Sequence, residues 1–74
     1  MTYEQAKEKA LKINAKLNAC REYTRAYHFY DKFDTTDRVP DNDVVILKES
    51  GKIVNLTTFI IDYHPEKIPQ QRRF

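Results

Sequence analysis

The fold is decided by "DVVILKESGKIVNL", which runs from Asp43 to Leu56. Its residues 44–47 form a short, continuous apolar run, the pattern of a strand that is buried on both faces. Ser50 and Gly51 then give a strong turn signal, because glycine takes positive φ without steric cost. This stretch therefore predicts an antiparallel hairpin, made of strands at about residues 43–49 and 52–60.

The N-terminal region has the spacing of an amphipathic helix. Thr2 and Gln5 fit a capping box, in which the hydroxyl accepts a backbone N–H and the amide reaches back to the N-cap. Apolar side chains then recur at steps of three and four residues, which places them on one stripe of a helix. The stripe consists of Tyr3, Ala6, Ala10, Ile13 and Leu17. We predict a helix over about residues 2–17 with this stripe facing a sheet.

Aromatic and β-branched residues dominate the region between the helix and the hairpin, which is typical of a strand. We expect one strand at about residues 22–32, with Tyr27 and Phe29 facing the core. The predicted fold class is α+β: one N-terminal helix packed on a three-stranded antiparallel sheet (α-β-β-β), in a single domain of residues 1–74. An exposed edge of such a sheet is a place for a homodimer or a partner strand to form.

Two C-terminal segments leave alternatives open. The stretch "TTFIIDYHPEK" either continues the strand or forms a short helical turn that begins at Thr57 or Thr58 and stops before Pro65. The course of residues 59–64 stays undecided between strand and short helix. The tail, residues 65–74, contains two prolines and few apolar residues, so we expect it to be flexible or to dock as an arm.

Length and composition favour a binding protein. The chain has 74 residues, and its longest apolar runs are far short of the roughly 20 residues that a membrane span needs. The N-terminus lacks the apolar centre of a signal peptide, and Cys20 is the only cysteine, so we expect a soluble, cytoplasmic protein without a disulfide. A domain this small buries only about 60% of its unfolded surface, which leaves little volume for a deep active site.

An aspartate-rich segment, "DKFDTTDRVPDND", runs from Asp31 to Asp43. Its aspartates step by three, three, four and two residues without a glycine between them, which does not match an EF-hand calcium loop. Nothing predicts the substrate cleft that a catalytic carboxylate pair requires. The segment is either a solvated connection, because Asp, Asn and Pro favour turns, or a surface that faces a partner.

Cys20, His28 and His64 are the remaining candidates for metal binding or nucleophilic catalysis. Their spacings match no zinc pattern. A Cys20–His28 nucleophile pair needs a third, orienting group and an oxyanion site, and the sequence predicts neither. We therefore expect no catalytic residue, no metal and no cofactor, and we predict that the protein is not an enzyme.

Tyr23, Arg25, Tyr27 and Tyr30 support an alternative function. Aromatic rings with basic neighbours on an open sheet can stack the bases of single-stranded nucleic acid. The same rings are needed to fill a small core, and Asp31 beside them would repel phosphate. A nucleotide- or single-stranded nucleic-acid-binding accessory module is therefore the alternative, with these four residues as its binding face.

Two pieces of the chain carry a resemblance: "AYHFYDKF" and "NDVVILKESGKIVNLTTFIIDY". The pattern resembles the small bacterial immunity-type proteins of polymorphic-toxin systems, in the group numbered thirty-five. Those proteins combine an N-terminal helix, an aromatic strand and a hairpin with a glycine in its turn. The chain also resembles short accessory proteins of bacteria and their phages. The resemblance implies a protein-binding inhibitor and carries over no site residues, while the aspartate-rich segment and the basic tail depart from the pattern.

These observations predict a small non-catalytic binding protein that sequesters or inhibits a macromolecular partner. We expect a basic protein partner, because four aspartates are candidate contacts, with two arginines of the tail as a second surface. The candidate contacts are Asp34, Asp37, Asp41, Asp43, Arg72 and Arg73. The identity of the partner and the oligomeric state stay open.

Overall fold

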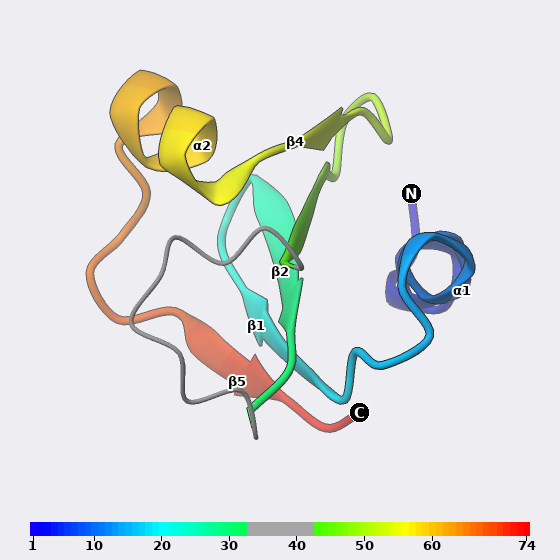
Figure 1. Cartoon of the computed structure of the whole chain (residues 1–74). Coiled ribbons are helices and arrows are strands. Elements are labelled where there is room, and N and C mark those ends of the chain that lie inside the picture. The colour runs from blue at the N-terminus through cyan, green and yellow to red at the C-terminus, as the bar shows by residue number, and fades with distance from the viewer. Residues whose placement is uncertain (33–42) are drawn as a thin grey trace.

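The computed structural model describes residues 1–32 and 43–74, and it has the expected α+β class (Figure 1). Within these residues, two helices flank an antiparallel sheet whose five strands follow the order β4-β3-β2-β1-β5. The prediction of one helix and three strands was therefore wrong in its details. In chain order the elements are α1 (Tyr3–Ile13), β1 (Ala19–Glu22), β2 (Ala26–Tyr30), β3 (Val44–Leu47), β4 (Ile53–Val54), α2 (Leu56–Tyr63) and β5 (Gln70–Arg72).

The predicted hairpin is present as β3 and β4, with Val45 opposite Val54. Gly51 takes φ 71° in its turn and donates its amide hydrogen to the carbonyl of Leu47 at 2.8 Å. The second strand is much shorter than predicted, because Asn55 starts a helix instead of continuing the strand. Its side chain accepts a hydrogen bond from the backbone N–H of Thr58 at 2.7 Å, which is N-cap geometry.

The undecided segment is therefore helix α2, which begins at Leu56, before the predicted starts at Thr57 or Thr58. It ends at Tyr63, and the C-cap residue His64 has a φ of 45°, in the left-handed region that terminates many helices. Pro65 follows directly, and the residue before a proline is disfavoured in the helical region.

The single aromatic strand predicted at residues 22–32 is wrong, because the chain reverses within it. The amide of Tyr23 donates to the carbonyl of Ala26 at 2.8 Å and closes a tight turn between β1 and β2. The two strands then pair antiparallel, with Arg21 opposite His28. Neither residue inside this turn is a glycine, proline or asparagine, so the usual turn signal is missing from the sequence.

The tail docks on the chain's own sheet. Its residues Gln70–Arg72 form β5, which pairs antiparallel with β1 so that Cys20 lies opposite Arg72. The edges of the sheet are consequently β4 and β5, two of its shortest strands. Neither helix in the described part of the chain is long and apolar enough to cross a membrane.

The predicted capping box of α1 is confirmed, with Thr2 and Gln5 bonding each other's backbone amides. The helix ends at Ile13 rather than near Leu17. Ile13 was expected on the buried stripe but is 52% exposed, because the helix stops before its next turn can cover the sheet. The other members of the stripe point as predicted, with Ala6 and Ala10 fully buried.

Two apolar cores lie on the two faces of the sheet, one beneath each helix (Figure 1). Side chains alternate along β3, so Val44 and Ile46 join the core under α1, while Val45 and Leu47 join the core that contains Phe59 of α2. The continuous apolar run in the sequence is thus explained by burial on both sides. Tyr27 and Phe29 face α1, as predicted.

Candidate functional site

The acidic contacts predicted from the sequence fall into two groups. Asp34, Asp37 and Asp41 lie outside the described residues. Asp43 lies at the start of β3, where its Oδ2 is 2.6 Å from Nε2 of His28 on β2. Both side chains are almost fully enclosed, with 11% and 4% of their surface exposed. Asp43 therefore tethers two strands and does not offer its carboxylate to a partner.

Burial lowers the pKa of His28, and the hydrogen bond and negative charge of Asp43 act in the opposite direction without cancelling it. The imidazole is therefore neutral near neutral pH, and its Nε2–H donates to the Asp43 carboxylate. The other ring nitrogen, Nδ1, is buried and has no hydrogen-bond partner in residues 1–32 and 43–74. Arg21 adds a further lowering of this pKa.

Cys20 cannot form a nucleophile pair with His28 in this fold. Cys20 belongs to the core under α1, whereas His28 stands opposite Arg21 on the other face of the sheet. The Cys20 thiol donates weakly to the carbonyl of Arg21 at 3.7 Å, and burial raises its pKa to about 12. A thiol with this pKa is almost wholly protonated at neutral pH and is a poor nucleophile or metal ligand. No group of three potential metal-ligating side chains gathers among the described residues.

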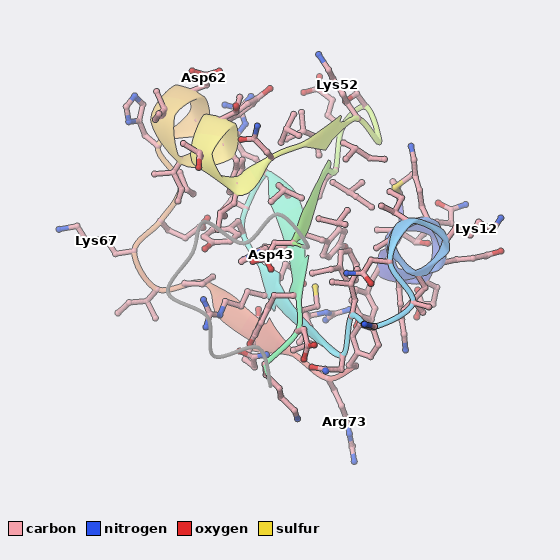
Figure 2. The ribbon with its side chains drawn as sticks, in the orientation of Figure 1. Lys12, Asp43, Lys52, Asp62, Lys67 and Arg73 are labelled. Atoms are coloured by element: carbon pink, nitrogen blue, oxygen red, sulfur yellow. The ribbon has the colours of Figure 1, made fainter. Side chains whose placement is uncertain are left out.

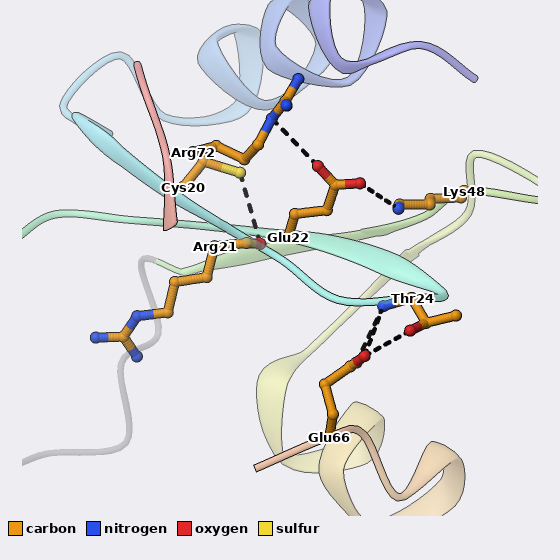
Figure 3. Close-up of polar contacts among 7 residues, drawn as sticks. All are labelled: Cys20, Arg21, Glu22, Thr24, Lys48, Glu66 and Arg72. Carbon is orange, nitrogen blue, oxygen red and sulfur yellow. Dashed lines mark hydrogen bonds and ion pairs between the residues drawn. The ribbon is translucent and has the colours of Figure 1, made fainter. Parts of the chain in front are cut away.

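The basic tail is also partly committed to the fold. Arg72 Nε lies 3.2 Å from Oε1 of Glu22, and the Arg72 guanidinium stacks 4.6 Å from the ring centre of Tyr3. The second oxygen of the Glu22 carboxylate lies 2.6 Å from Nζ of Lys48 (Figure 3). Arg73 is exposed, and its backbone carbonyl accepts a hydrogen bond from the Tyr3 hydroxyl. Of the two predicted tail contacts, Arg73 is the more accessible.

The four residues of the alternative nucleic-acid face do not share one surface. Tyr27 is buried under α1, where only 7% of it is exposed. Tyr23 packs edge-on against Phe59 at 5.2 Å in the core under α2. Tyr30 lies beside His28, with the Arg21 guanidinium 4.6 Å from its ring centre. The turn between β1 and β2 separates these rings, and of the three tyrosines Tyr30 is the one whose ring has an arginine, Arg21, over it in the described residues.

The outer side of α2 is a feature that the sequence reasoning missed. Phe59 is the one fully buried residue of this helix, while Ile60 and Ile61 are 51% and 62% exposed. We call these two residues the isoleucine face. Contiguous exposed apolar side chains on a small domain mark interaction surfaces more often than scattered ones do. The three apolar residues Phe59, Ile60 and Ile61 are visible in the sequence. They indicate an exposed apolar surface only once the segment is known to be a helix with Phe59 pointing inward.

A cleft of about 420 Å³ opens at one end of the sheet, between the two hairpin turns and the end of α2. We call it the Arg25 cleft. Its lining is Thr24, Arg25, Leu47, Lys48, Glu49, Ser50, Lys52 and Tyr63. The Arg25 guanidinium lies 5.0 Å from the ring centre of Tyr63, which joins the first turn to the helix.

Thr24, which lines the Arg25 cleft, is held in place by Glu66. Glu66 accepts hydrogen bonds from both the amide and the hydroxyl of Thr24, which lowers the pKa of the Glu66 carboxyl (Figure 3). The amide of Lys48 donates to the carbonyl of Arg25 at 2.9 Å and ties the two turns together. The cleft is therefore built on backbone that its own hydrogen bonds hold in place.

No family model, no curated protein and no solved structure matches this chain.

Proposed function

We propose that this protein is a non-catalytic binding domain that sequesters or inhibits a protein partner, and that the isoleucine face of α2 is its main contact. The observation that carries the proposal is the exposure of Ile60 and Ile61 on a helix that is capped at its start and anchored in the core. Asn55 caps the start of the helix, and Phe59 anchors its inner side in the core. A rigid helix that presents apolar side chains loses little entropy when a partner covers it.

The energetic gain from covering this face is appreciable for a small domain. Full burial of an isoleucine stabilises by about 1.5–3 kcal/mol, and about half of that remains available at each of these positions. Covering both side chains therefore contributes roughly 1.5–3 kcal/mol to a complex. Asp62 is an exposed charge on the same helix and supplies the polar rim that protein interfaces usually have (Figure 2).

Addition of a partner strand is the less favoured mode of binding. The sheet edges are β4, with two residues, and β5, with three residues, and such short strands offer few backbone hydrogen bonds. The homodimer expected at a sheet edge is for the same reason a weaker proposal than contact through α2. The immunity-type resemblance supports the same functional class, a protein-binding inhibitor.

A basic partner stays a separate proposal, because it rests on Asp34, Asp37 and Asp41. The ten residues 33–42 hold those three aspartates and one arginine, which leaves twelve Lys/Arg and eight Asp/Glu in the described residues. The described body is thus cationic and the aspartate-rich segment anionic. The charge distribution therefore does not decide whether the partner surface that contacts the described residues is acidic or basic.

The decisive experiment compares two exposed isoleucines of matched accessibility. Ile13 on α1 is 52% exposed and Ile60 on α2 is 51% exposed, so replacing either with serine removes a similar apolar area. A photo-crosslinking residue at position 61 and, separately, at position 13 identifies the partner in the native host. Partner affinity and partner activity are then measured with Ile60→Ser and its matched control Ile13→Ser, and with the double variant Ile60→Ser/Ile61→Ser.

We expect the double variant to lose at least about tenfold in affinity, which is about 1.4 kcal/mol, and to relieve the inhibition of the partner. Ile13→Ser should leave both unchanged. Equal crosslinking from positions 13 and 61, or full affinity of the double variant, would refute the α2 interface.

Binding of single-stranded nucleic acid is the second candidate, and one observation favours it. The Arg21 guanidinium lies over the Tyr30 ring at 4.6 Å, and an arginine–aromatic pair of this kind can stack a base. Fluorescence anisotropy with a labelled single strand across a salt series separates the two candidates. A steep loss of binding with salt, abolished by Tyr30→Ala, would favour nucleic acid over a protein partner.

A further inference from the structure

We propose that the Arg25 cleft binds a single carboxylate side chain, a glutamate or aspartate that the protein partner inserts next to the isoleucine face. This inference rests on the proposed function and adds the chemistry of the partner to it. The cleft has the volume of an ordinary small-ligand site, and its lining is mostly polar or charged, with a smaller apolar part. Leu47 and Tyr63 supply the apolar part.

Arg25 is the residue that selects the ligand. It is exposed at the turn between β1 and β2, and its guanidinium carbon lies over the Tyr63 ring, 5.0 Å from the ring centre. Within residues 1–32 and 43–74 this guanidinium forms no hydrogen bond and no ion pair, so the edge that carries its N–H donors is unused. An arginine that stacks on an aromatic ring keeps this edge available, and the edge matches a carboxylate in a two-pronged hydrogen bond.

The two lysines that line the cleft differ in whether a carboxylate already neutralises them. Lys48 is already neutralised, because its ammonium lies 2.6 Å from Glu22 and 4.9 Å from the ring centre of Tyr27, both on the α1 side of the sheet. Lys52 is exposed at the turn between β3 and β4 (Figure 2). Arg25 and Lys52 therefore supply the positive charge that an incoming anion meets.

Nearby carboxylates limit how much negative charge the cleft accepts. Glu49 lines the cleft, and Glu66 binds Thr24 on its wall. These two negative charges largely offset Arg25 and Lys52, so the long-range field at the cleft is weak. A doubly charged phosphate would meet repulsion, whereas a single planar carboxylate gains the directional hydrogen bonds of Arg25. The geometry thus favours an acidic protein side chain over the phosphate of a nucleic acid.

The position of the cleft connects it to the proposed interface. Tyr63 follows Ile60 by three residues, and residues with this spacing are neighbours on the surface of a helix. A partner that covers Ile60 therefore reaches the rim of the Arg25 cleft without a change in the fold. An acidic residue beside an apolar patch is the expected complement on the partner.

The test uses the full chain and two short capped peptides, one with a single glutamate between leucines and one with glutamine in its place. Binding is followed by the NMR shifts of backbone amides during titration. We expect the glutamate peptide to shift the amides of Thr24, Arg25 and Ser50, and to bind at least about tenfold more tightly than the glutamine peptide. Inorganic phosphate and a short oligothymidylate are titrated in parallel and should bind more weakly than the glutamate peptide.

Three variants make the test specific to the arginine fork. Arg25→Lys keeps the charge but not the planar fork and should lose most of the preference for glutamate over glutamine. Tyr63→Phe keeps the ring under Arg25 and should retain the preference. Lys12→Ala removes a cation on α1, far from the cleft, and should have no effect (Figure 2).

The inference is overturned if both peptides bind equally, if Arg25→Lys retains the full preference, or if the oligothymidylate shifts the same amides more strongly. Since the peptides are independent of the natural partner, these results do not decide whether the isoleucine face binds a protein. Loss of partner binding in Ile60→Ser/Ile61→Ser decides that question separately.

Discussion

Nζ of Lys48, at the end of β3, lies 2.6 Å from Oε2 of Glu22 on β1, although β2 separates these two strands in the sheet. The lysine crosses above the Tyr27 ring of β2 to reach the carboxylate. Oε1 of the same carboxylate holds Arg72 of β5. One side chain thus connects three strands and fixes the last of them against the first.

Replacing Glu22 with glutamine should destabilise the fold by about 1–2 kcal/mol, because two cations lose their counter-charge at a partly enclosed site. Urea unfolding at constant pH measures the change. Glu8→Gln is the matched control, since Glu8 forms an exposed pair with Lys12 and should cost less than about 0.5 kcal/mol. Equal losses in the two variants would contradict a special role for Glu22.

Stability should fall as the solution is acidified, because His28 has a pKa below its ordinary value of 6.5 in the fold. The unfolded chain then binds a proton more readily than the folded one, so the free energy of unfolding decreases as pH drops below that ordinary value. It stops decreasing below the folded pKa. The slope from this group reaches at most about 1.4 kcal/mol per pH unit.

Unfolding of the wild type and of His28→Gln in urea across this pH range isolates the contribution of His28. The glutamine amide can donate to Asp43 but does not titrate, so the variant should have a flatter pH profile. A steep profile retained in His28→Gln would assign the effect to other groups.

Asn55→Ala should destabilise the protein by about 1 kcal/mol, because the side-chain oxygen that accepts from the amide of Thr58 is lost. Asn55→Asp keeps an accepting oxygen and should retain the wild-type free energy of unfolding. Hydrogen exchange of the amides in α2 locates the loss, with faster exchange expected there than in β2. If α2 exchanges at the same rate in both variants, the cap does not hold this helix.

The acidic residues should separate into two classes when replaced with asparagine. Asp43→Asn weakens the bond to His28 and should lower the free energy of unfolding by about 1–3 kcal/mol, because a buried charged hydrogen bond is lost. The triple variant Asp34→Asn/Asp37→Asn/Asp41→Asn tests the predicted contact with a basic partner. If the partner is basic, the triple variant associates more slowly at low salt and equally fast at high salt.

The hairpin, the capping box and the inward rings of the aromatic strand could be predicted because their signals are local. Gly51 predicts its turn because glycine readily takes positive φ, and Thr2 with Gln5 predicts the start of α1. Strand β5 has no local signal: Gln70 and Gln71 are exposed, and the strand forms because β1 offers a free edge and Glu22 holds Arg72. Pairing with a strand that lies far away in the sequence leaves no periodic pattern in the residues of β5 itself.

The positions of the candidate site residues could not be predicted from the sequence, because they depend on which strands lie side by side. Asp43 looks like its neighbouring aspartates in the sequence, and only the register that brings it to His28 reveals a buried role. Tyr23 and Tyr27 appear on one face if residues 22–32 form one strand, and the turn at Tyr23 moves them to opposite faces. The isoleucine face required the helical assignment of α2, and the Arg25 cleft required both turns and the end of that helix.

The pairing of β1 with β5 has a consequence for the order in which the strands of the sheet form. The Gln71 side chain donates to the carbonyl of Cys20 from a position 51 residues later in the chain. Until β5 docks, the outer edge of β1 is therefore unpaired during folding, and such an edge is a site at which two chains can join each other.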